Sequence, residues 1–191
     1  HHFAQQIIDY VNAHEWRIPV RISDESEELL NTGGGLHKAG ELFSDDGQPI
    51  LIHNVDILSN APIQEFYKNH LTHDATLLVS ERDTQRYLLF DDDMRLRGWT
   101  NIATGEVRSP FTNIEPEKLH RYAFSGIHMF SPRLFALMEH YPKAFPIMDF
   151  YLNECAKADI RGCVQPNLRL MDVGKLNTLH EAEHFVNELG L

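Results

Sequence analysis

The sequence predicts an α/β protein: a mostly parallel, Rossmann-like sheet sandwiched by helices, with a small antiparallel β insertion. Two observations predict this class. Short apolar segments alternate with amphipathic segments of helical spacing along most of the chain. The apolar segments hold few polar residues, which is typical of parallel strands that helices cover on both faces. Residues 86–112 differ, because they hold short strand-like segments separated by turns.

The composition limits the class of protein further. Hydrophobic residues make up 42% and charged residues 24% of the 191 residues, which are ordinary globular values. The formal net charge of −11 argues against nucleic acid or an acidic membrane as a partner. Cys155 and Cys163 lack a metal-binding or redox spacing, and no apolar run approaches 18 residues. We therefore expect a soluble, cytoplasmic protein with free thiols.

In the first half of the chain, hydrophobic spacing and turn residues set the expected elements. We expect helices at 2–14, 36–43 and 62–73, and strands at 17–23, 49–58 and 75–80. Gly33, Gly34 and Gly35 come between a strand and a helix. Three consecutive glycines cost conformational entropy unless the backbone needs positive φ or close approach by another group. We interpret them as a loop, either a plain turn or one whose amides meet a ligand.

In the second half, the hairpin-like stretch is followed by a return to alternation. Residues 86–112 predict three short antiparallel strands. After them we expect strands at 122–130, 160–164 and 168–173, and helices after Ser131, at 146–158 and at 177–189. We therefore expect one domain, residues 1–191, with the insertion at 86–112.

Aspartates at the ends of two predicted strands are candidates for a metal site. Asp56 lies near the end of 49–58, and Asp172 near the end of 168–173. Ligands bind open α/β sheets at the carboxyl ends of the strands. Mg²⁺ prefers oxygen ligands and often binds one or two carboxylates together with substrate phosphates. Taken singly, each aspartate is also typical of a turn or a helix cap, and spacing alone leaves both interpretations open.

Four segments, in this order, resemble the sugar-phosphate nucleotidyltransferases. They are EELLNTGGG (27–35), HNVDIL (53–58), YAFSGIHMFSP (122–132) and LMDVGKLNTLHEAE (170–183). Members of this family join a nucleoside triphosphate to a sugar 1-phosphate, giving a nucleotide sugar and pyrophosphate. The resemblance is strongest to single-domain mannose 1-phosphate guanylyltransferases and N-acetylmuramate 1-phosphate uridylyltransferases. It therefore implies a role in making cell-envelope polysaccharides.

The resemblance also implies roles for eight residues. The implied Mg²⁺ ligands, which are also the catalytic residues, are Asp56 and Asp172. The implied nucleotide-binding residues are Glu28, Gly33 and Gly34, and the implied sugar-binding residues are Asn54, Gly126 and Asp149. Glu28 would accept hydrogen bonds from ring N–H donors, which suits guanine or uracil. The implied catalysis consists mainly of positioning and charge stabilisation.

The sequence departs from this family in two places. The family's N-terminal glycine-rich loop, with its arginine and lysine, does not occur in these residues. We therefore expect about 50 further residues upstream in the intact protein, the size of the rest of a βαβ unit, and little activity from these 191 residues alone. Some members also have a sugar-binding glutamate just before the position of Asp149, where this chain has Phe145 and Pro146.

Two other functions stay open. A protein with this fold and no phosphate loop would be a non-catalytic sensor of nucleotide sugars. HEAEH at 180–184 matches the HExxH pattern of zinc hydrolases, with two histidines one helical turn apart. A zinc site there would need a third protein ligand from elsewhere in the chain. We interpret the two histidines as a solvated flank of the last helix.

Overall fold

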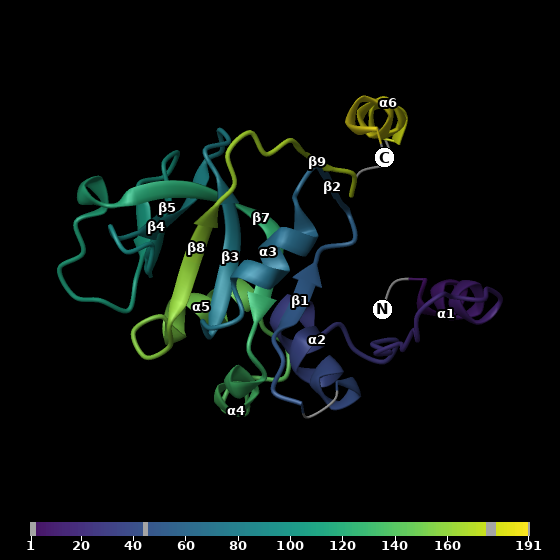
Figure 1. The fold of residues 1–191 in the computed structure, drawn as a ribbon. Helices are drawn as coiled ribbons and strands as arrows, with labels where there is room; N and C mark the ends of the chain where they lie inside the picture. The colour runs from purple at the N-terminus through teal and green to yellow at the C-terminus, as the bar shows by residue number, and fades with distance from the viewer. Residues whose placement is uncertain (1–2, 44–45, 175–178, 191) are drawn as a thin grey trace. The chain divides into compact units, whose positions relative to one another are not determined.

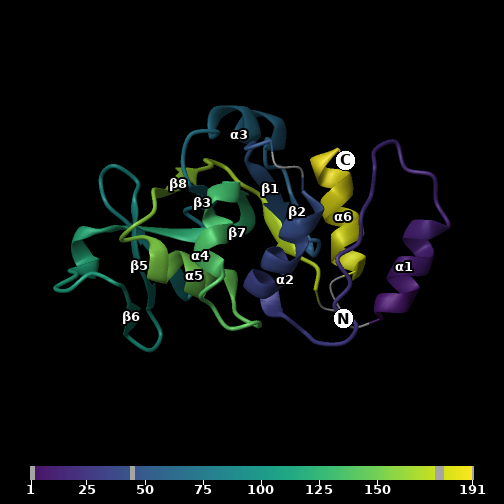
Figure 2. The same ribbon diagram turned by 90° about the horizontal axis from the view of Figure 1, so that it is seen from below.

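The computed structural model describes residues 3–43, 46–174 and 179–190, without the side chains of residues 179 and 180. The chain forms two compact units. The smaller unit comprises His1–Gly47 and Pro132–Tyr151, and the larger one Gln48–Ser131 and Leu152–Leu191. Figures 1 and 2 show the elements of both.

The larger unit contains a seven-stranded sheet with the order β6-β5-β4-β7-β3-β8, in which β1 also pairs with β7. Its strands are β1 (Ile50–His53), β3 (Ala75–Ser80), β4 (Arg86–Phe90), β5 (Leu96–Asn101), β6 (Glu106–Arg108), β7 (His120–Phe130) and β8 (Ile160–Val164). A separate two-stranded sheet pairs β2 (Ile57–Ser59) with β9 (Leu170–Asp172). The expected strand at 49–58 is therefore two strands, with a turn at residues 54–56.

The α/β class is confirmed, but the parallel part of the sheet is smaller than expected. Among the described residues, β3 and β8 form the one parallel pair, from Ala75 opposite Ile160 to Val79 opposite Val164. The long strand β7 runs antiparallel to β1, β3 and β4. Strand β3 is buried along its whole length, as its continuous apolar run predicts.

A hydrophobic cluster joins one face of this sheet to helix α3 (Ile63–Asn69). Phe66 of α3 packs with Leu78 of β3 and with Ile127 and Met129 of β7, all of them buried. In Figure 1, α3 lies across the middle of β3. This cluster holds the central strands in place, and the turn at 54–56 follows directly from β1 in the same sheet.

The predicted β insertion is confirmed as antiparallel, and it is continuous with the main sheet. Strand β5 pairs with both β4 and β6. Strand β4 pairs with β7, with Leu88 opposite Tyr122. The insertion therefore extends the sheet at one edge.

The smaller unit is mainly helical. It holds α1 (Ala4–Asn12), α2 (Asn31–Ala39), α4 (Phe135–Met138) and the first part of α5 (Ile147–Glu154). The predicted strand at 17–23 is wrong, because these residues have no ladder partner among the described residues and form no strand. In the larger unit, α6 spans Leu179–Leu189. Within the described ranges, every helix is too short or too polar to cross a lipid bilayer.

Candidate functional site

The small sheet of β2 and β9 brings Asp56 and Asp172 together. Ile57 lies opposite Asp172 in this antiparallel pair. One residue further along, the Val173 amide donates a hydrogen bond of 2.8 Å to the Asp56 carbonyl. The Asp172 carboxylate accepts a 2.9 Å hydrogen bond from the Gly174 amide, which fixes its orientation. The two aspartates that the sequence singled out are therefore neighbours across one strand pair.

Gly174 leaves a space into which both carboxylates point. A Cβ atom placed on Gly174 would lie 3.0 Å from Asp56 Oδ2 and 3.2 Å from Asp172 Oδ1. The two oxygens therefore flank the position where a side chain would stand in any other residue. Asp56 is half-buried and Asp172 is exposed, so a ligand reaches the pair from solvent. Such an arrangement fits Mg²⁺, which binds one or two carboxylates and takes its other oxygens from phosphates and water.

Asn54 and Gly126 meet beside this pair, in the same unit. The Asn54 amide donates a hydrogen bond of 3.0 Å to the Gly126 carbonyl. Gly126 has a φ of +79°, and a Cβ there would come within 3.0 Å of Asn54 Nδ2. Both the backbone conformation and the close approach of Asn54 therefore require glycine at this position of β7. The structure brings together four of the eight predicted residues, and their roles toward metal and sugar stay predictions.

The three glycines lie in helix α2, so the prediction of a loop is wrong. Phe145 and the backbone of Lys143 take the space that side chains would fill. A Cβ on Gly33 would lie 2.4 Å from the Phe145 ring, and one on Gly34 would lie 2.2 Å from the Lys143 carbonyl oxygen. The amides of Gly33 and Gly34 donate to the Phe145 carbonyl at 2.8 and 3.2 Å. The chain itself approaches these glycines, and their role in nucleotide binding stays a prediction.

A pocket in the smaller unit, which we call the Glu28 pocket, holds two of the predicted nucleotide-binding residues. Its volume is about 390 Å³, and its lining includes Glu27, Glu28, Gly34, Lys38 and Lys143. The Lys143 ammonium forms an ion pair with the Glu28 carboxylate. The hydrogen bond from Lys143 to Glu28 raises the pKa of the lysine, with the Glu28 charge the next cause. Lys143 is therefore charged at neutral pH.

Lys143 could not be predicted from the sequence. It lies 115 residues from Glu28, and a single lysine near a proline carries no pattern that predicts a pocket. The signal lies in the three glycines, which predict close approach by some part of the chain but not by which part.

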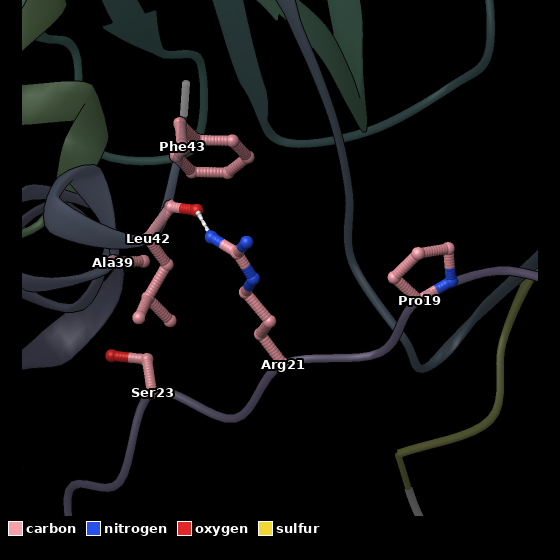
Figure 3. A pocket seen from close by; sticks show the side chains of 6 residues that line it. All are labelled: Pro19, Arg21, Ser23, Ala39, Leu42 and Phe43. Carbon is pink, nitrogen blue, oxygen red and sulfur yellow. Dashed lines mark hydrogen bonds between the residues drawn. The ribbon is translucent and has the colours of Figure 1, made fainter. Parts of the chain in front are cut away.

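A second pocket in the smaller unit contains none of the predicted residues. Its volume is about 510 Å³, and Figure 3 shows its lining from Pro19 to Phe43. The Arg21 guanidinium donates a hydrogen bond to the Leu42 carbonyl. The Ser23 hydroxyl oxygen is buried and has no hydrogen-bond partner within the described part of the chain. Asp149, the remaining predicted sugar-binding residue, lies in the first turn of α5.

The HEAEH segment lies at the start of α6. Ala182 is buried, whereas His184 is exposed and forms an ion pair of 3.1 Å with Glu188. The side chain of His180 lies outside the described residues. Among the side chains that the structure does describe, no three histidines, cysteines or acids gather as metal ligands.

No family model matches the chain. Its fold is similar to that of HddC from Yersinia pseudotuberculosis complexed with GMP-PN, at 21% identity and a TM-score of 0.63, covering 95% of this chain and 74% of that one. The inositol-1-phosphate CTP transferase of T. maritima matches at 8% identity and a TM-score of 0.66, covering 98% of this chain and 73% of that one. A Bacillus anthracis protein provisionally named glucose-1-phosphate thymidylyltransferase matches at 13% identity and a TM-score of 0.62, covering 88% and 64%. The chain therefore shares the fold of these three proteins.

Proposed function

We propose that this protein is a nucleotidyltransferase that joins a nucleoside triphosphate to a sugar 1-phosphate and releases pyrophosphate. The observation that carries the proposal is the convergence of Asp56 Oδ2 and Asp172 Oδ1 beside Gly174. Among the proteins of similar fold, one is complexed with GMP-PN, and another is named as a transferase that acts on inositol 1-phosphate and CTP. A nucleotide and a phosphorylated polyol as substrates are consistent with this proposal.

Asp56 and Asp172 are proposed to hold Mg²⁺. When bound, the cation supplies positive charge to the phosphates of both substrates, which a protein with a net charge of −11 would otherwise repel. The Gly174 amide holds the Asp172 carboxylate in place before any ligand arrives. The absence of a side chain at Gly174 leaves room beside both carboxylate oxygens.

Asn54 and Gly126 are proposed to contact the sugar. The exposed Asn54 side chain carries both a donor and an acceptor, which suits sugar hydroxyls. The Asn54 amide is hydrogen-bonded to the Gly126 carbonyl, so the two residues are positioned together.

In the proposed reaction a phosphate oxygen of the sugar 1-phosphate attacks the α-phosphorus of the triphosphate in line, and pyrophosphate leaves. No covalent intermediate on the protein is needed, and the protein's contribution is positioning.

A substrate screen tests this proposal. The full-length protein is incubated with Mg²⁺, each of the common nucleoside triphosphates and a panel of sugar 1-phosphates, and pyrophosphate release is measured. We expect release with one triphosphate and one or a few sugar 1-phosphates, and none with the same sugars lacking the phosphate. If the protein binds a nucleotide but releases pyrophosphate with no pair of triphosphate and sugar 1-phosphate, the result would contradict the proposed activity. It would favour a non-catalytic sensor of nucleotide sugars.

A further inference from the structure

Exposed hydrophobic side chains are concentrated at the start of the chain. Six of the twelve large hydrophobic residues that are exposed in the described part of the chain lie within its first 20 residues. They are Phe3, Ile7, Tyr10, Trp16, Ile18 and Val20, which we call the N-terminal surface. Trp16 folds back on α1, where its indole N–H donates 2.8 Å to the Val11 carbonyl and its ring centroid lies 6.3 Å from that of Tyr10. A patch of this kind marks a surface that another segment covers.

Helix α1 has the pattern of a helix that packs on a partner. Ile7 and Tyr10 follow Phe3 at spacings of four and seven residues, which places all three on one stripe of the helix. Ile7 and Tyr10 are 56% and 59% exposed, and no residue of α1 is buried. A surface helix ordinarily buries such a stripe. The described residues therefore leave the apolar stripe of α1 uncovered.

The segment that follows α1 is extended and has an unpaired backbone. Pro19, Arg21 and Ser23 all line the pocket shown in Figure 3, whereas Val20 between them is 43% exposed. Side chains that alternate in this way are typical of a β-strand. The backbone N–H and C=O groups of residues 17–23 make no hydrogen bond with any described residue. The segment therefore has the geometry of a strand and a free set of backbone donors and acceptors.

The proline determines which edge of this segment can pair. In an extended chain, the backbone groups of successive residues point to opposite edges. Pro19 has no N–H, so the edge that it shares with Arg21 and Ser23 lacks a donor, and a proline in a sheet is confined to an edge that faces solvent. Val20 and Ile22 present both an N–H and a C=O on the other edge. A partner strand therefore pairs at the edge of Val20 and Ile22.

We propose that the N-terminal surface is the docking site of the residues expected upstream of His1, and that these residues add a β-strand at the edge of Val20 and Ile22. A stretch of about 50 residues is long enough for a strand and a segment that covers α1, and it joins the chain directly before this helix. The similar folds support this occupant, because the chain covers 74% of HddC and 73% of the inositol-1-phosphate CTP transferase. About a quarter of each of those chains has no counterpart here. The inference does not depend on the proposed activity.

Residue-resolved amide hydrogen exchange of the full-length protein tests the pairing. We expect the amides of Val20 and Ile22 to exchange at least about a hundredfold more slowly than those of Arg21 and Ser23, which lie on the other edge of the same segment and serve as controls. Equal exchange at all four amides would overturn the proposal. Protection that disappears when the protein is diluted to a monomer would also overturn it, since a second copy would then be the partner. An intact protein without residues upstream of His1 would do the same.

Two variants of the full-length protein test whether α1 is covered. Ile7→Ala should lower the melting temperature by about 5 °C or more, the effect of truncating a buried side chain in a protein of this size. If Ile7 stayed exposed in the intact protein, alanine would leave the melting temperature unchanged or raise it, because alanine favours the helix. Gln6→Ala is the matched control, and we expect a change within about 1 °C. An unchanged or higher melting temperature in Ile7→Ala would overturn the docking on α1.

Discussion

The triglycine of α2 and the aspartates beside Gly174 looked alike in the sequence, since each pattern left open both a structural role and a contact with a ligand. In the structure the glycines already have a partner, because Phe145 and the Lys143 carbonyl fill the space beside Gly33 and Gly34. The Asp56 carboxylate differs, since it makes no hydrogen bond or ion pair with any described residue. A glycine run can be explained by the protein's own packing. Packing within the described residues does not explain two converging carboxylates of which one makes no hydrogen bond or ion pair there. The aspartates are therefore the stronger candidate site.

The largest expected effect is the loss of one of the two aspartates. Asp56→Asn and Asp172→Asn keep the side-chain volume but remove a negative charge that Mg²⁺ needs. We expect turnover to fall about a hundredfold or more, equivalent to roughly 3 kcal/mol, with thermal stability unchanged or slightly higher. The measurement is pyrophosphate release against Mg²⁺ concentration. Near-normal rates in both variants would remove the metal site from the proposal.

Gly34→Ala tests whether the packing of the Lys143 segment against α2 requires a glycine. Its Cβ would stand 2.2 Å from a backbone oxygen, so the Lys143 segment must move. We expect a loss of about 2 kcal/mol in the free energy of unfolding, the usual scale of overpacking. Gly35→Ala is the control, because its Cβ meets only the flexible end of Glu25, and alanine favours the helix. Denaturant titration compares the two, and equal stabilities would mean that the glycines are not needed for packing.

Acidification should affect the sheet of the larger unit through His128. This side chain is 2% exposed in β7, and burial lowers its pKa from 6.5 to about 3. A group whose pKa is lowered on folding contributes stability above its unfolded pKa and loses it as the pH falls. We expect a loss of about 2 kcal/mol between pH 7 and pH 5. Burial lowers the pKa of His70 too, so it contributes in the same direction.

Denaturant titrations at pH 7 and pH 5 measure this loss. His128→Gln, which does not titrate in this range, should lower stability at both pH values but show a smaller difference between them. An unchanged difference in this variant would contradict the assignment to His128.

Gly174→Ala is the mildest test. Its Cβ would lie 3.0 and 3.2 Å from the two carboxylate oxygens, so each must shift by a few tenths of an ångström. We expect the Mg²⁺ concentration for half-maximal activity to rise about tenfold, since small displacements at a reacting centre are costly. Stability should not change, because the residue is exposed. A variant with the normal Mg²⁺ dependence would show that the space beside Gly174 is not used.

The bounds of an element were predicted best from the sequence where the element is buried along its whole length. They were predicted worst where contacts with distant segments determine the local structure. Strand β3, which is buried along its whole length, has the predicted bounds. Three glycines weaken a helix by about 1 kcal/mol each relative to alanine, so local preference argued against α2, and packing against Phe145 overrode it. The segment at 17–23 has strand-like composition but no strand to pair with among the residues that the structure describes. Asp56 and Asp172 were predictable because polar residues at strand ends stand out from their neighbours.

The smaller unit is made of two stretches of chain, with residues 48–131 of the larger unit between them. Thr32 Oγ1 accepts from the Ile147 amide across 115 residues. Contacts this distant along the chain form slowly, because a long loop must close first. During synthesis, the glycine face of α2 therefore emerges early and has nothing to pack against until residues 143–147 have left the ribosome. Strands β1 to β7 are made in that interval, and α2 completes its packing only after them.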